Sequence, residues 1–135
     1  MREIQSWAGP ADHIARTRPE TALHYFCPAT LQATARRFRE GFAGVVTFAV
    51  KANPDEAVLA NLVAAGVTAF DVASPAEMEA VRAICPQAVL HYNNPVRTPE
   101  EVMAAASAGI TAAAVACPRE QAKLASQPRS TEGAV

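Results

Sequence analysis

The chain has 135 residues, of which 50% are hydrophobic and 19% are charged, and its formal net charge is −1 at pH 7. This composition is typical of one globular domain with a single core. A near-neutral charge without a large cluster of lysine and arginine argues against binding to nucleic acid or to an anionic membrane. The N-terminus has no apolar segment of the kind found in secretion signals, so we expect a cytoplasmic protein.

The first part of the chain precedes a regular pattern. Its beginning is polar and contains Pro10 and Pro19, which predicts an irregular arm. The stretch "ALHYFCP" (22–28) has the composition of a strand, and a helix is expected over about 29–40. The end of the chain has no hydrophobic periodicity. We therefore divide the chain into an arm (1–20), a main domain (21–126) and a loose tail (127–135).

From residue 45 onward one unit repeats: an apolar strand, a turn with a capping residue and a proline, and a helix with an acidic first turn. The repeat length of about 20–23 residues suits a strand, a helix and two short loops. The strands are expected at 45–50, 68–73, 88–92 and 111–116, followed by Asn53-Pro54-Asp55-Glu56, Ser74-Pro75-Ala76-Glu77, Thr98-Pro99-Glu100-Glu101 and Cys117-Pro118-Arg119-Glu120.

The first three turns each place a side-chain acceptor at the expected N-cap, with a glutamate three residues later. The fourth has Cys117, a poor cap, at that position. The helix expected over 54–65 has an apolar stripe of Val58, Leu59, Leu62 and Val63, with Gly66 as its C-terminal glycine. A similar stripe begins at Val102 and Met103 in the helix expected over 99–108. This alternation predicts an α/β fold with a parallel sheet.

Several common functional motifs are absent from the sequence. The three cysteines are widely separated and have no C-x-x-C pair, so a disulfide framework or a structural metal site is not expected. The glycines form no phosphate-binding or dinucleotide-binding pattern. The uncharged run 102–117 is too short to cross a membrane and is better explained as a helix, a turn and a strand.

Polar side chains occur at the ends of the expected strands, where parallel sheets collect reactive groups. The apolar run "VVTFAV" ends in Lys51, which by itself is most simply a lysine reaching solvent. Alternation places Lys51 with Thr47 and Ala49, on the face opposite the bulky Val46, Phe48 and Val50. Asp71 occupies the same face of the next strand. The two side chains are therefore expected to face one interior.

Each of the other polar residues also has a purely structural explanation. Asp71 can serve as a local capping or pairing carboxylate, and Glu77 is explained by a capping box with Ser74. His91 shares a face of the third strand with Asn93, and by itself is better explained as a structural histidine with its hydrogen bonds made.

The segment "TFAVKANPDEAVLANLVAAGVTAFDVASPAEMEAV" (47–81) resembles the cofactor-lysine segment of the fold-type III pyridoxal-phosphate decarboxylases, which act on ornithine, lysine, diaminopimelate or arginine. "AVKAN" lies on one strand and "FDVAS", with a following glutamate, on the next. "HYNNPVRTPEEV" (91–102) resembles the next strand end of that family, where an Asn-Pro-x-Lys or Asn-Pro-x-Arg run is usual. The resemblance extends from about residue 22 to about residue 123.

The resemblance implies a partial TIM (β/α)8 barrel of about four strand–helix units, like that of alanine racemase. It implies that Lys51 forms the Schiff base with pyridoxal phosphate, that Asp71 lies beside the cofactor, and that Glu77 is a neighbour one layer out. A semi-buried, cation-poor site would favour the deprotonated lysine that imine formation requires. The arm at 22–28 would cross to the family's second, β-rich domain.

The chain also departs from that family. The glycine-rich phosphate loop, the phosphate-binding arginine, the acidic partner of the pyridine nitrogen and the cysteine–aspartate pair donated across the dimer have no counterpart, and Ala116 replaces a frequent aspartate. A complete barrel takes about 250 residues. Four parallel strands would leave two unpaired edges. We expect the chain alone to aggregate, to self-associate, or to be a truncated piece of a longer reading frame.

The sequence thus predicts decarboxylation of a basic amino acid, ornithine or lysine, in polyamine synthesis, by a family whose full-length members are expected to be homodimers. The present chain is expected to be an amino-terminal fragment that is inactive alone. Two alternatives stay open. One is a racemase of the same fold or a small pyridoxal-phosphate carrier, although "NPDEAV" lacks the tyrosine-and-glycine loop typical of racemases. The other is a non-catalytic truncated module that pairs with a full-length homologue.

Overall fold

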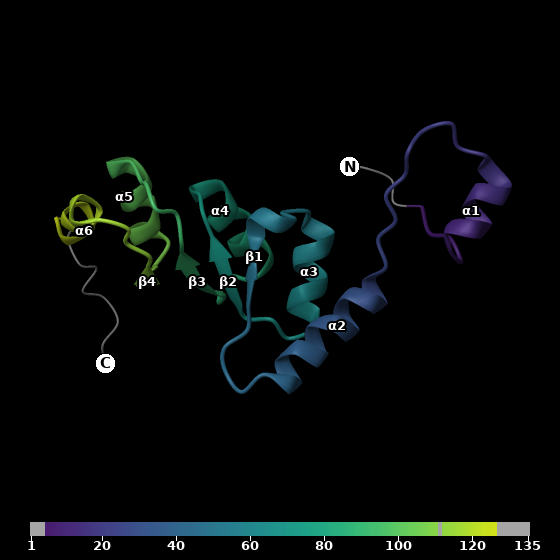
Figure 1. Cartoon of the computed structure of the whole chain (residues 1–135), viewed down its shortest axis with the longest axis horizontal. Coiled ribbons are helices and arrows are strands. Elements are labelled where there is room, and N and C mark those ends of the chain that lie inside the picture. Colours follow the sequence, from purple (N-terminus) through teal and green to yellow (C-terminus); the bar gives the residue numbers. More distant parts are fainter. Residues whose placement is uncertain (1–4, 111, 127–135) are drawn as a thin grey trace.

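The computed structural model describes residues 5–110 and 112–126. Its four strands pair in parallel in the order β1-β2-β3-β4, and helices alternate with them along the chain (Figure 1). The elements are α1 (Pro10–Thr17), α2 (Pro28–Gly41), β1 (Thr47–Ala49), the 3-10 turn η1 (Val50–Ala52), α3 (Glu56–Ala64), β2 (Ala69–Val72), α4 (Pro75–Ile84), β3 (Val89–Tyr92), α5 (Pro99–Ser107), β4 (Ala112–Ala113) and α6 (Pro118–Ala125). The predicted alternation and parallel sheet are confirmed.

The two central strands are longer than the two edge strands. β2 and β3 each have four residues, whereas β1 has three and β4 has two. The predicted strands were longer because an apolar run does not show where pairing stops. An edge strand has a ladder of hydrogen bonds on one side only.

The core lies between the sheet and the helices. On β2, Phe70 and Val72 are buried and Asp71 between them is half-buried, so side chains alternate between the two faces as predicted. Consecutive helices contact one another in chain order from α2 to α6. The core cluster comprises Ala35, Val50, Val58, Leu59, Leu62, Ala65, Val67, Phe70, Val72, Met78, Val81, Ala88, Leu90, Tyr92 and Ala105.

One predicted core position is wrong. Val102 is buried in α5 as expected, but Met103 is 57% exposed. The second buried position of α5 is Ala105, three residues after Val102. The stripe of α5 is therefore narrow, because this helix is rich in alanine and has few large apolar side chains to bury.

The helix caps follow the prediction at α4 and α5. Ser74 Oγ accepts a hydrogen bond from the Glu77 N–H at 3.3 Å. Thr98 and Glu101 form a complete capping box with distances of 3.2 and 2.8 Å. Cys117 makes no side-chain cap at α6, as expected from its chemistry.

The cap of α3 differs from the prediction. Asp55 is the N-cap, and its Oδ1 accepts a hydrogen bond from the Ala57 N–H at 2.9 Å. Asn53 instead accepts from the Asp55 N–H at 3.1 Å, in an Asx turn that precedes the helix. Because Asp55 provides the cap two residues after Asn53, the helix begins later than predicted. The predicted C-terminal glycine is confirmed, because Gly66 has a φ of 86° directly after α3.

The N-terminal segment differs from the prediction in two ways. The arm expected to be irregular contains helix α1, which begins at Pro10 and has an Asp12–Arg16 ion pair of 2.7 Å one turn apart. The stretch 22–28 is not a strand, because it is exposed and has no neighbouring strand with which to pair. Figure 1 shows α1 away from the sheet, at the end of an extended connection to α2. The helix expected over 29–40 is confirmed as α2.

Among the described residues, no helix is long and apolar enough to span a membrane.

Candidate functional site

The carboxyl ends of the strands carry the predicted site residues. β1 ends at Ala49, and Lys51 lies in the turn η1 that follows it. Val50 is completely buried and anchors this turn, and its carbonyl accepts a hydrogen bond from the Asn53 N–H at 3.1 Å. Lys51 itself is exposed. The semi-buried environment expected for Lys51 is therefore absent. The described strands form one open sheet, and no second layer of strands covers Lys51.

Asp71 lies on the face of β2 opposite the core. In the strand register it is paired with Ala49 on β1 and with His91 on β3. Lys51 follows Ala49 by two residues, so the structure brings Lys51 and Asp71 to neighbouring strand ends at one edge of the sheet. They form no ion pair with each other. Asp71 is half-buried and Lys51 is exposed, so solvent has access to the space between them.

Glu77 differs in part from its prediction. Its N–H is capped by Ser74 as expected, but its Oε2 accepts a hydrogen bond from the Ala73 N–H at 2.8 Å instead of from Ser74. The Ala73 carbonyl accepts a hydrogen bond from Asn94 Nδ2 at 3.1 Å. Both polar groups of Ala73 are thus bonded to side chains. The carboxyl end of β2, two residues after Asp71, is held from α4 and from the loop after β3.

β3 contributes one residue to each face of the sheet near this edge. His91 is half-buried on the face of Asp71, and its ring makes no side-chain hydrogen bond to the described residues, so the expectation that its ring hydrogen bonds are made is not supported. Tyr92 is buried on the helix side, and its hydroxyl has no partner among the described residues. Burial, followed by the negative charge of Glu101, raises the pKa of the Tyr92 phenol.

Arg97 is a buried residue that the sequence did not single out. Its side chain is 1% exposed, and its Nη2 donates hydrogen bonds to the carbonyl oxygens of Tyr92 and Ala114 at 2.9 and 2.5 Å. Glu120 and Lys123 of α6 contact its backbone. The "NNPVR" run, with its resemblance to a family strand end, was the available signal, but it gave no indication of burial.

The edge offers suitable groups for part of a pyridoxal phosphate molecule. The exposed amine of Lys51 can react with an aldehyde, and the Asp71 carboxylate can accept hydrogen bonds from ring substituents. Two cations near this edge, Arg97 and Lys123, donate to backbone carbonyls, and Lys123 also donates to Glu120. Lys51 and Asp71 therefore fit the reactive end of the cofactor.

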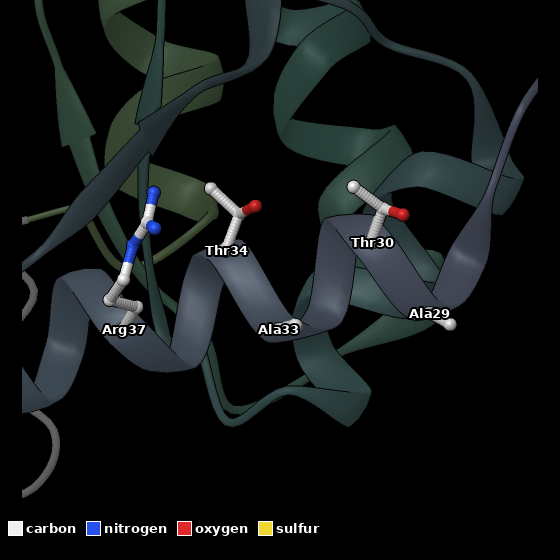
Figure 2. A pocket seen from close by; sticks show the side chains of 5 residues that line it. All are labelled: Ala29, Thr30, Ala33, Thr34 and Arg37. Carbon is white, nitrogen blue, oxygen red and sulfur yellow. The ribbon is translucent and has the colours of Figure 1, made fainter.

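A shallow hollow of about 420 Å³ lies along α2 and involves none of these residues. It is lined by Ala29, Thr30, Ala33, Thr34 and Arg37. Figure 2 shows Thr30, Thr34 and Arg37 projecting from one side of that helix. The hollow is separate from the strand ends and does not extend the candidate site.

Comparison with known families gives one match that covers most of the chain. Residues 29–132 match the model described as pyridoxal-dependent decarboxylase, pyridoxal binding domain. This domain is named for its cofactor, so the match agrees with the expected use of pyridoxal phosphate and with the resemblance found in the sequence. A search of curated proteins gave no match.

Solved structures similar to this one include two decarboxylases. A lysine/ornithine decarboxylase from Vibrio vulnificus, crystallised with putrescine, is 21% identical, with a TM-score of 0.64 over 71% of this chain. An ornithine decarboxylase from Entamoeba histolytica is 25% identical, with a TM-score of 0.65 over 73% of this chain. The chain spans 27% of the length of the first and 31% of the second. The predicted partial (β/α)8 barrel is thereby confirmed.

Proposed function

Because this chain belongs to the pyridoxal-dependent decarboxylases, through their pyridoxal-binding domain, we propose that Lys51 is the residue that binds pyridoxal phosphate covalently. The proposal is carried by the position of Lys51: an exposed amine directly after β1, at the carboxyl edge where parallel α/β sheets bind ligands. As a free amine, Lys51 would hold the cofactor by bonding to its aldehyde carbon with loss of water.

Asp71 and Glu77 have different roles in this proposal. Asp71 shares the open face of the sheet with His91 and lies near Lys51, so its carboxylate contacts the cofactor directly. Glu77 Oε2 accepts a hydrogen bond from the Ala73 N–H, which in this proposal places Glu77 one layer out from the cofactor. Its role is to fix the end of β2, and through it the position of Asp71.

The reaction that we propose is decarboxylation of a basic amino acid, with ornithine as the substrate and lysine as the second choice, in polyamine synthesis. Support comes from the two similar structures, which are named as decarboxylases of ornithine or of lysine and ornithine. The cofactor, when bound, supplies an electron sink for the carbanion formed as carbon dioxide leaves. The described residues contribute an amine and a carboxylate, and none of them is placed to recognise a distal amine of the substrate.

The described residues hold only part of the proposed site. We propose that the 135-residue chain is inactive alone, that the active form needs the other half of a barrel, and that the complete enzyme is a cytoplasmic homodimer. In support of this, Lys51 and Asp71 fit only the reactive end of the cofactor, and the chain spans 27% and 31% of the length of the two similar decarboxylases.

Borohydride trapping on the intact chain tests the role of Lys51. The sequence contains two lysines, Lys51 and Lys123, so peptide mapping by mass spectrometry assigns a reduced pyridoxyl adduct without ambiguity. Lys123 is a matched control, because its Nζ is bound to Glu120 and to the Arg97 carbonyl. We expect the adduct on Lys51, at least about tenfold above that on Lys123, and its loss in Lys51→Ala.

Equal labelling of the two lysines would instead indicate non-specific reaction of surface amines. A trapped yield that Lys51→Ala leaves unchanged would exclude Lys51 as the cofactor lysine. Labelling concerns binding alone, so it stays informative even if the chain has no catalytic activity.

The free edges of the sheet favour a second candidate function, a non-catalytic module that pairs with another barrel half. Val45 next to β1 and Val115 next to β4 are exposed at the two edges of the described sheet. Light scattering on the purified chain distinguishes the candidates, since a monomer that traps the cofactor on Lys51 would argue against the pairing module.

A further inference from the structure

The loop that follows β3 is connected to its neighbours on both sides. We call residues 93–97 the NNPVR loop. Toward β2, the Asn93 N–H donates to the Val72 carbonyl at 3.0 Å, and Asn94 Nδ2 donates to the Ala73 carbonyl at 3.1 Å. Toward β4, Arg97 Nη2 donates to the Ala114 carbonyl. One short loop therefore joins the carboxyl ends of three strands.

Arg97 is the central contact of this loop on the β4 side. Its Nη2 bridges the carbonyls of Tyr92, the last residue of β3, and Ala114, the residue after β4. Its own backbone receives contacts from α6: the Arg97 N–H donates to Glu120 Oε2 at 3.3 Å, and Lys123 Nζ donates to the Arg97 carbonyl at 2.7 Å. Through Arg97, α6 is attached to two strand ends at once.

The chemistry of Arg97 is unusual for a residue that only fills space. Its Nε and Nη1 have no hydrogen-bond partner among the described residues, and its guanidinium carbon lies 4.7 Å from the centre of the Tyr92 ring. Burying a cation without a paired carboxylate is unfavourable, and an unbranched apolar side chain would fill the same space without that penalty. The two carbonyl contacts of Nη2 are what an apolar residue would not provide.

We propose that Arg97 is a positioning residue for the cofactor edge, an inference that rests on the proposed function. By holding the Tyr92 and Ala114 carbonyls together, it fixes the ends of β3 and β4. The NNPVR loop then carries this constraint to Ala73 through Asn94. Asp71, two residues before Ala73, keeps its register with His91 and its place beside Lys51. Arg97 acts through these backbone contacts and does not itself touch the cofactor.

Amide hydrogen exchange in the full 135-residue chain tests this role without any cofactor. Arg97→Met keeps the approximate volume of the side chain and removes all of its hydrogen-bond donors. We expect exchange at the Asn93 and Ala114 amides, which bond across the carboxyl edge, to accelerate by about tenfold or more relative to the Val89 amide at the amino edge. Arg97→Lys, which can still donate to one carbonyl, should accelerate them by about threefold.

Arg82 provides a matched control within the same layer. Its Nη1 and Nη2 also donate to backbone carbonyls, those of Pro86, Ala88 and Ala108, but at the amino edge. Arg82→Met should accelerate exchange at the Val89 amide more than at the Ala114 amide. The ratio of the Ala114 exchange rate to the Val89 exchange rate should therefore fall. If Arg97→Met accelerates all three amides equally, or none, Arg97 contributes to general stability only and the proposal is wrong.

Borohydride trapping of the cofactor tests whether Arg97 affects the reaction at Lys51. Under conditions where circular dichroism shows both variants equally folded, Arg97→Met should lower the borohydride-trapped yield on Lys51 by about fivefold, and Arg82→Met should leave it unchanged. A yield unaffected by Arg97→Met would overturn the link to the cofactor edge. If the unaltered chain traps nothing, the proposed function fails, whereas the exchange data still decide whether Arg97 holds the edge. Should Arg97→Met not fold, Arg97→Lys provides both measurements.

Discussion

The second and fourth repeat units have the same sequence pattern but are stabilised differently. In the second unit, β2 and α4 bury Phe70, Val72, Met78 and Val81, and Ser74 caps the helix. In the fourth, β4 has two residues, the cap side chain makes no bond, and Glu120 is the buried residue of α6. The same pattern can therefore be held by apolar packing or by a small group of charges.

The glutamate three residues after each cap, Glu77 or Glu120, has different partners in the two units. Glu77 reaches back to the backbone next to its own cap, at Ala73. Glu120 is three residues after Cys117 but is bound to Lys123 and to the N–H of Arg97, 23 positions away. A glutamate at this position can serve its own helix end or a distant loop, and the available partners decide between the two.

The largest expected effect comes from removing the packing of the second unit. Phe70→Ala should lower the free energy of unfolding by about 3–5 kcal/mol, because Phe70 is completely buried and its loss leaves a cavity. Phe38→Ala is the matched control, since Phe38 is 61% exposed on α2 and should change stability by less than about 0.5 kcal/mol. Urea unfolding measures both. Similar losses in the two variants would contradict a core centred on β2.

Removing the N-cap side chain of the second unit should have a smaller effect on stability. Ser74→Ala removes the acceptor for the Glu77 N–H and should cost about 1 kcal/mol. The exposed Ser107 makes no side-chain hydrogen bond to the described residues, so Ser107→Ala should be close to neutral in the same urea experiment.

The reverse change should stabilise the fourth unit. Cys117→Ser adds a side-chain acceptor to an N-cap that lacks one and should stabilise the chain by up to about 1 kcal/mol relative to Cys117→Ala. A serine no better than alanine at this position would mean that the cap geometry of α6 does not allow the bond.

The smallest effect concerns pH and should be confined to the fourth unit. The hydrogen bond from Lys123 lowers the pKa of the Glu120 carboxyl, with a smaller contribution in the same direction from Arg97. A carboxyl whose folded pKa is lowered stabilises the fold above its unfolded pKa, about 4.3, and this contribution is lost as the pH falls through the lower folded value. Attachment of α6 should therefore weaken in mild acid.

Glu120→Gln isolates that contribution. Between about pH 6 and about pH 3, the unaltered chain should lose more stability than Glu120→Gln, as followed by urea midpoints at each pH. Equal losses in the two proteins would show that the Glu120 carboxylate does not stabilise the attachment of α6.

The features that depend on neighbouring residues could be predicted from the sequence. The alternation of strands and helices, the caps at Ser74 and Thr98, and the glycine after α3 follow from interactions within a few positions, which a sequence pattern records directly. The positions of Lys51 and Asp71 at adjacent strand ends also followed, because parallel pairing aligns those ends.

The features that depend on distant residues could not be predicted in this way, because folding sets them. The exposure of Lys51 reflects which strands are present to cover it. The partners of Glu77 and Glu120, and the burial of Arg97 between β3, β4 and α6, depend on groups that folding brings together. A local pattern cannot record such contacts, because hydrogen-bond partners are chosen by proximity in space and by the cost of leaving a buried group unpaired.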